Sequence, residues 1–147
     1  MWSRCIVRYQ HIIVQGNFDD SPSNMSTPHS KRVCQIIKLK PEAEAEYKSL
    51  HAVVWPGVLA AIARHHIVDY SIHYYPPLQL LIATFKYTGS DYEADMNGIA
   101  EDEETRRWWK LTDGMQESFV GGATESGREI PWWQELEEVF RFEGASP

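Results

Sequence analysis

The order of strand-like and helix-like segments constrains the fold of this chain more than any other feature of its sequence. Residues 33–39 are short, apolar and β-branched, which is typical of a buried strand. Two further strand-like runs, Ile67–Tyr75 and Leu78–Tyr87, meet at Pro76-Pro77 and predict a β-hairpin. Leu136–Phe142 predicts a closing strand.

Two helical regions separate these strands. The first is expected from Pro41 to about His66, because a helix accepts proline in its first turn. Pro56 should kink this helix or end it early. The second region covers residues 91–99 and 103–116, with a break expected around Gly98. A long loop is expected over Glu117–Pro131, so the element order is βαββαβ.

This order predicts an α+β, ferredoxin-like fold, in which a four-stranded antiparallel sheet carries both helices on one face. The other face of such a sheet is bare unless something covers it. Ile, Val, Leu, Tyr and Phe fill the predicted strands, so a second subunit is the natural cover. We therefore expect one domain over residues 31–147 that assembles as a homodimer.

Residues 1–30 differ from the rest of the chain. Their apolar runs are short and are followed by a polar stretch, so they lack the continuous apolar core of a secretory signal. They hold two basic and two acidic residues, which leaves the whole formal charge of −7 in residues 31–147. We expect a disordered or non-native N-terminal extension, with the functional chain starting near Met25.

Composition excludes several classes of partner. With 14 Lys+Arg against 21 Asp+Glu, the chain lacks the basic excess of a nucleic-acid-binding surface. No run approaches the roughly 20 apolar residues that would cross a membrane. The two cysteines, Cys5 and Cys34, cannot form a framework of several disulfides. These features predict a cytoplasmic protein.

One stripe of the first predicted helix could carry chemistry. Tyr47, His51 and Trp55 are spaced i, i+4 and i+8, on the same face as several aliphatic residues. In one interpretation His51 is a core histidine that bonds to Tyr47 while Trp55 packs. In the other, a pocket opens here and His51 is a general acid and base, since an imidazole titrates near neutrality.

Each of two tryptophan pairs could either bind a ligand or serve packing. Trp108 and Trp109 point about 100° apart on a helix, so at most one can lie flat against a given ligand. Both could also be packing residues. For Trp132 and Trp133, beside a predicted strand, packing or a dimer interface is favoured.

The sequence carries no motif for a metal or a cofactor. His65, His66 and His73 lack the carboxylate or cysteine spacing that would complete a metal site. Gly121-Gly122 and Gly127 do not form a phosphate-binding loop. No serine or cysteine lies in a nucleophile motif. We therefore expect proton transfer in a small pocket, without metal or cofactor.

Residues 45–56 read A-E-Y-K-S-L-H-A-V-V-W-P and resemble the E-Y-x-x-x-H-x-x-x-W-P signature of L-rhamnose mutarotases. Arg107–Lys110 resembles a second signature of that family, and Leu136–Phe140 resembles its terminal strand. The resemblance extends from about Lys31 to Glu143. It departs from the family at Ala52-Val53 and in the long loop.

The resemblance implies a dimeric α/β-barrel that interconverts the α and β anomers of L-rhamnose without a cofactor. By this resemblance His51 is the proton donor, and Tyr47 and Tyr70 contact the sugar. Trp108 and Trp109 line the sugar site. In the implied reaction His51 protonates the ring oxygen, while water or a tyrosine hydroxyl relays the proton of the anomeric hydroxyl.

Two other functions are compatible with the same scaffold, because a fold does not determine a reaction. One is a cofactor-independent monooxygenase acting on a polycyclic aromatic substrate, which an aromatic pocket with a histidine would also serve. The other is a non-catalytic module for sugar binding or dimerisation.

Overall fold

A computed structural model describes residues 30–144, so all but the last residue of the expected N-terminal extension lies outside the described part. The strands are β1 (Lys31–Leu39), β2 (Ile67–Tyr75), β3 (Leu80–Tyr87), β4 (Gln116–Glu117) and β5 (Gln134–Glu135). The helices are α1 (Glu44–Ala52), α2 (Pro56–Arg64), α3 (Tyr92–Glu101) and α4 (Glu103–Gly114), with 3₁₀ turns η1 (Pro41–Ala43) and η2 (Pro76–Leu78).

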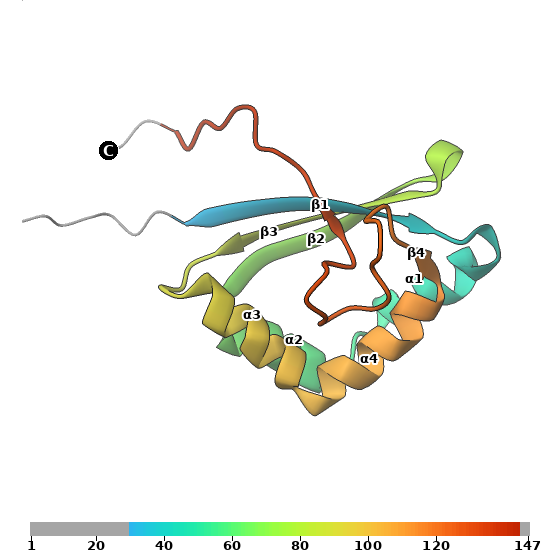
Figure 1. Ribbon diagram of the computed structural model, residues 1–147, viewed down its shortest axis with the longest axis horizontal. Helices are drawn as coiled ribbons and strands as arrows, with labels where there is room; N and C mark the ends of the chain where they lie inside the picture. Colours follow the sequence, from blue (N-terminus) through green and yellow to red (C-terminus); the bar gives the residue numbers. More distant parts are fainter. Residues whose placement is uncertain (1–29, 145–147) are drawn as a thin grey trace, which may run out of the picture.

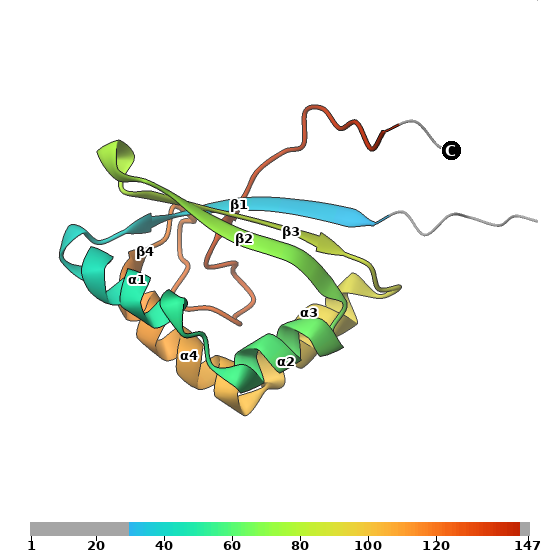
Figure 2. The same cartoon turned by 180° about the vertical axis from the view of Figure 1, so that it is seen from behind.

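The sheet is antiparallel with strand order β2-β3-β1-β4, and β5 also pairs with β1. It curls over the helices, which all lie on its concave side (Figure 1; Figure 2 shows the same arrangement from behind). This arrangement confirms the α+β, ferredoxin-like fold. Each helical region consists of two helices, so an interruption is present in both regions, as expected.

The predicted closing strand Leu136–Phe142 is wrong. Only Gln134 and Glu135 pair there, opposite Ile36 and Gln35 of β1. The same edge of β1 is already occupied further along by β4. After the bond from the Leu136 amide to the Cys34 carbonyl, the chain leaves the sheet and rises on the side away from the helices (Figure 1). The fourth strand position is therefore shared by two short strands.

The core follows the alternation of β1 and β3. Residues that point to the helices are buried and fall into two clusters, one built on Ile37 and Leu39 and the other on Val33. Gln35 lies between them on the same face of β1, because side chains alternate along a strand. It lines a cavity instead of filling the core. The gap between the clusters thus coincides with a polar residue.

Pro56 decides where the first helical region breaks. It stands at the first position of α2, where its missing amide hydrogen costs nothing, and α1 has already ended at Ala52. The helix expected to reach about His66, with a kink or an early end at Pro56, is therefore two helices, the second of which ends at Arg64. This break leaves His51 in the last turn of α1 and Trp55 at the entry to α2.

The second break falls at Asp102 and not around Gly98. The Asp102 carboxylate accepts a hydrogen bond from the Thr105 amide at 2.8 Å, which caps the start of α4. Gly98 lies within α3, where the His65 ring occupies the space that a Cβ atom would need. Glycine here serves close packing between α3 and the end of α2.

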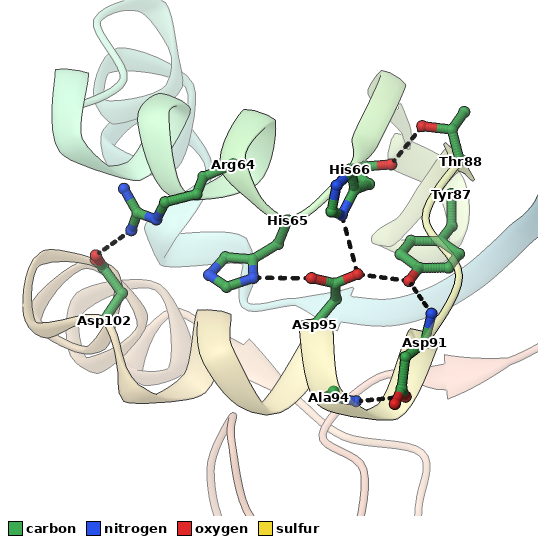
Figure 3. A network of polar contacts seen from close by, with 9 residues as sticks. All are labelled: Arg64, His65, His66, Tyr87, Thr88, Asp91, Ala94, Asp95 and Asp102. Carbon is green, nitrogen blue, oxygen red and sulfur yellow. Dashed lines mark hydrogen bonds and ion pairs between the residues drawn. The ribbon is translucent and has the colours of Figure 1, made fainter.

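A polar network attaches α3 to the sheet (Figure 3). The Asp95 carboxylate accepts hydrogen bonds from His65 Nδ1 at 3.1 Å, from His66 Nδ1 at 3.0 Å and from the Tyr87 hydroxyl. The Tyr87 oxygen in turn accepts a bond from the Asp91 amide. Asp95 therefore ties α3 both to the turn before β2 and to the end of β3.

We predict that Asp95→Asn lowers the free energy of unfolding near neutral pH. The bond from Tyr87, then those from both histidines, hold the pKa of Asp95 below its ordinary value of 3.8. An acid with a lowered pKa stabilises the fold above its ordinary value and loses that contribution as pH falls through its folded value. Urea unfolding from pH 7 to pH 3 should show a difference in unfolding free energy between wild type and variant that becomes smaller below pH 4. Glu93 is an exposed acid of the same helix, so Glu93→Gln is the control. A loss of unfolding free energy of similar size in both variants would contradict the prediction.

Candidate active site

A cavity of about 750 Å³ lies on the concave side of the sheet. β1, β2 and β3 form one wall, the helices another, and the segment between β4 and β5 a third. Its lining is mainly apolar and aromatic, with a small number of polar groups: Gln35, His51, Tyr70, Ser71, Asn97 and Thr105 from strands and helices, and Ser126, Arg128 and Glu129 from the loop. A concave apolar site with few polar groups is typical of small-molecule binding.

The protonation of the His51 ring follows from its hydrogen bond. His51 Nδ1 lies 2.9 Å from the Tyr47 carbonyl oxygen, one turn earlier in α1. A carbonyl only accepts, so Nδ1 must carry the hydrogen. In the neutral ring, Nε2 is then the atom with a free lone pair. Because Nδ1 is bonded to the helix backbone, Nε2 is the nitrogen available to a ligand.

Aromatic rings surround this imidazole. The Tyr47 ring stacks on it with centroids 4.0 Å apart, and Trp108 meets it edge to face at 5.2 Å. Burial lowers the pKa of His51 below 6.5, and the bond to the Tyr47 backbone only partly opposes this shift. The ring is therefore neutral at pH 7, with a basic nitrogen next to the cavity.

The two tyrosines of the predicted site have different positions. Tyr70 lines the cavity and packs against Phe85 at 5.4 Å. The residue as a whole is 39% exposed, while desolvation of its hydroxyl raises its pKa to about 12. Tyr47 is 4% exposed and lies behind His51, outside the cavity lining. Burial raises the pKa of Tyr47 as well. Both phenols are therefore un-ionised at neutral pH.

A β-bulge accompanies the placement of Tyr70. The register between β2 and β3 shifts between Val68 and Ser71, and Asp69 has a φ of 52°. A bulge inserts an extra residue and re-aims the side chains beside it. Simple alternation along Ile67–Tyr75 does not reveal this irregularity.

Both tryptophans of α4 line the cavity. Trp108 is 5% exposed and contacts Trp55 edge to face at 5.4 Å as well as His51. Trp109 is half-buried and lies beside Gly127 of the loop. Trp108 thus supports the imidazole, while Trp109 forms a separate part of the wall.

Gln116 is a buried residue that connects Trp132 to Tyr47, and the sequence did not predict this role. Its Oε1 accepts a hydrogen bond from Trp132 Nε1 at 3.1 Å. An indole only donates, so this contact fixes the amide orientation and directs Nε2 to the Tyr47 hydroxyl oxygen, 3.5 Å away. Tyr47 accepts this bond and keeps its own hydrogen free to donate. No motif at Gln116 indicates this role, since it depends on contacts 69 and 16 residues away.

Trp132 and Trp133 do more than the packing expected of them. Both pack against the Ile37 cluster and also line the cavity. Their position at the end of the loop, directly before β5, brings them back under the sheet.

Within residues 30–144, no group of three or more His, Cys, Asp and Glu side chains is placed to hold a metal ion. His65 and His66 bind Asp95, while the His73 ring lies 3.2 Å from the Ser71 hydroxyl. In the same range, no helix is long and apolar enough to cross a membrane.

The site therefore combines a neutral imidazole, an un-ionised phenol and several aromatic faces. Such a set can move protons between neutral oxygen atoms, and aromatic faces suit a ligand that is apolar on one side and hydroxylated on the other.

Comparison with known proteins gives a consistent picture. A solved L-rhamnose mutarotase from Formosa agariphila has the same fold, with a TM-score of 0.59 at 23% identity over 78% of this chain and 100% of the other. An L-rhamnose mutarotase of Cronobacter sakazakii is 32% identical over 108 residues, 74% of this chain and 94% of the relative. That of Bacteroides thetaiotaomicron is 31% identical over 113 residues, 77% of this chain and 99% of the relative. The family model described as L-rhamnose mutarotase matches residues 32–142. The chain belongs to the L-rhamnose mutarotase family.

Proposed function

We propose that this protein interconverts the α and β anomers of L-rhamnose by general acid–base catalysis at His51. The observation that carries the proposal is the hydrogen bond from His51 Nδ1 to the Tyr47 carbonyl, which leaves a neutral, basic Nε2 in an aromatic cavity. Membership of the family supports the choice of sugar and reaction.

The reaction needs two proton transfers. Nε2 of His51 accepts the proton of the anomeric hydroxyl as the bond between the anomeric carbon and the ring oxygen breaks and a carbonyl forms. The resulting imidazolium donates that proton to the ring oxygen, or Tyr70 or a water molecule relays one there. Rotation about the bond to the open-chain carbonyl and closure on its other face give the second anomer. The neutral starting state makes His51 a base first and a donor second.

The remaining site residues bind and orient the sugar in this proposal. Tyr70 offers a hydroxyl at the cavity wall, and Trp108 and Trp109 offer aromatic faces to the C–H groups and the methyl group of a 6-deoxy sugar. Tyr47 holds the imidazole from behind, outside the cavity lining. The direct contact of Tyr47 with sugar stays a prediction.

We predict that His51→Ala abolishes the catalysed exchange between rhamnose anomers, a loss of about 10²–10⁴-fold or more, as expected for removal of a positioned acid–base group. Saturation-transfer NMR on the anomeric protons measures the exchange rate directly. His73→Ala is the matched control, because His73 lies on an exposed part of β2 away from the cavity lining. Wild-type exchange in a folded His51→Ala protein would remove His51 from the mechanism.

The same experiment separates the alternatives. A non-catalytic sugar-binding module would show no enhanced exchange in the wild type and no dependence on His51. A cofactor-independent monooxygenase would consume oxygen with a quinol-type aromatic substrate. The family assignment favours the mutarotase over both.

We predict that the exchange rate stays constant from pH 8 to pH 6.5 and falls only at lower pH. Burial lowers the pKa of His51, so the basic, neutral form persists below its ordinary value of 6.5. Acidification through the lowered value protonates Nε2 and removes the base. The pH dependence of the NMR exchange rate tests this. A rate that rises as pH falls from 7 to 5 would contradict it.

A homodimer in the cytoplasm belongs to the same proposal. The face of the sheet away from the helices carries no helix within residues 30–144 (Figure 2). Beside it, the C-terminal segment exposes Val139, Phe140 and Phe142 at 90%, 83% and 76%. A cluster of large exposed apolar side chains is typical of an interface. A second copy would cover both the segment and the bare face.

We predict that light scattering after size-exclusion chromatography gives a dimer for the wild type. Phe140→Asp combined with Phe142→Asp should shift the protein to a monomer, because charges replace side chains that a partner would bury. Phe119→Asp is the control, since Phe119 is 50% exposed but lies in the loop. A monomeric wild type would overturn the proposal.

A further inference from the structure

The segment between β4 and β5 folds into the space between the sheet and the helices (the orange-red loop in Figures 1 and 2). Residues 126–129 and Pro131 of this segment line the cavity. The loop is therefore a wall of the site, although it has no helix or strand of its own.

The two ends of this loop are attached at one place. The Ser118 hydroxyl donates to the Trp132 carbonyl at 2.6 Å, and the Trp132 indole donates to Gln116. These bonds close the loop at its base. They do not determine where its middle lies.

Asp113 of α4 holds the middle of the loop. The Ser126 amide donates to Asp113 Oδ2 at 2.7 Å, and the Ser126 hydroxyl donates to Asp113 Oδ1 at 2.7 Å. Within residues 30–144, these are the hydrogen bonds that tie residues 119–131 to a helix. Both carboxylate oxygens serve a single loop residue. Burial raises the pKa of Asp113, and the two bonds from Ser126 oppose that shift because they stabilise the ionised carboxylate.

Gly127, the residue after Ser126, shows how close the attached loop lies to Trp109. Gly127 has a φ of 74°, which favours glycine, and a Cβ atom there would lie 2.9 Å from Trp109 Cζ3. The loop backbone therefore lies directly on the Trp109 ring. Asp113 itself does not line the main cavity, whereas Ser126 and Gly127 do, so the loop connects Asp113 to a ligand there.

We propose that Asp113 and Ser126 form a latch that holds residues 126–131 as a wall of the sugar cavity and positions Trp109 for the ligand. This inference rests on the proposed function. Asp113 is a positioning residue, because it acts through Ser126 and Gly127. The latch does not contact His51, so its loss should weaken sugar binding and leave the proton transfers unchanged.

Two variants break the latch from opposite sides. Ser126→Ala removes the hydroxyl bond, and Asp113→Asn leaves one oxygen acceptor in place of two. For both we expect the KM for anomer exchange to rise roughly tenfold with kcat close to wild type, the pattern of lost binding rather than lost chemistry. Ser126→Thr keeps a hydroxyl and should restore the wild-type KM. Ser90→Ala, at an exposed turn, is the matched control.

Limited proteolysis gives a measurement that does not depend on activity. Arg128 is exposed and lies two residues after Ser126, so trypsin cleavage after Arg128 reports release of the loop. We expect faster cleavage in Ser126→Ala and Asp113→Asn, and wild-type cleavage in Ser126→Thr and Ser90→Ala. Mass spectrometry of the fragments identifies the site.

The outcomes are distinguishable. Unchanged cleavage and unchanged KM in both variants would overturn the latch. A loss of kcat without a rise in KM would overturn its role in binding. If the wild type shows no exchange, the proposed function fails, and the cleavage rates still decide whether Asp113 and Ser126 hold the loop.

Discussion

Strand β1 is the element on which the arrangement of the others depends. Along one edge it pairs with β3 over eight residues, and along the other it pairs first with β5 and then with β4. Because two short strands share that second edge, the chain between them must leave the sheet and return to it. Residues 118–133 make this excursion under the sheet, where they become a wall of the cavity (Figure 1).

The arrangement of the helices depends on the break between α1 and α2. Three residues separate the end of α1 from Pro56, the first residue of α2, which places His51 in the last turn of α1 and Trp55 beside Trp108. An uninterrupted helix would carry the stripe of Tyr47, His51 and Trp55 along one straight line. With the break, the aromatic rings gather around the imidazole from different directions, and the resulting burial keeps it neutral.

Much of the fold could be predicted because strands and helices leave local periodic patterns. The order βαββαβ, the hairpin and the long loop are confirmed. The strand at Leu136–Phe142 was wrong because residues such as Val139, Phe140 and Phe142 indicate strand propensity and not the presence of a free sheet edge. The break at Gly98 was wrong because that glycine serves packing against His65, whereas the Asp102 cap ends one helix and starts the next.

The candidate site, too, could be predicted from the sequence only in part. Its centre could be read locally, because Tyr47 and His51 lie one helical turn apart and their spacing alone brings them together. Gln116, Gln35 and the pair Asp113–Ser126 could not be found in this way. Each is an ordinary polar residue in sequence, and each acquires a role only through a partner or a cavity that the fold brings to it.

By itself, the sequence determined the element order, the Tyr47–His51 stripe and the resemblance to one family, since these depend on residue types at short spacing. Only the tertiary structure decided that Nδ1 of His51 is engaged and Nε2 free, that a bulge adjoins Tyr70, and that the loop lies on Trp109. The physical reason is that these features arise from hydrogen bonds and van der Waals contacts made when the chain has folded, and local periodicity does not encode them.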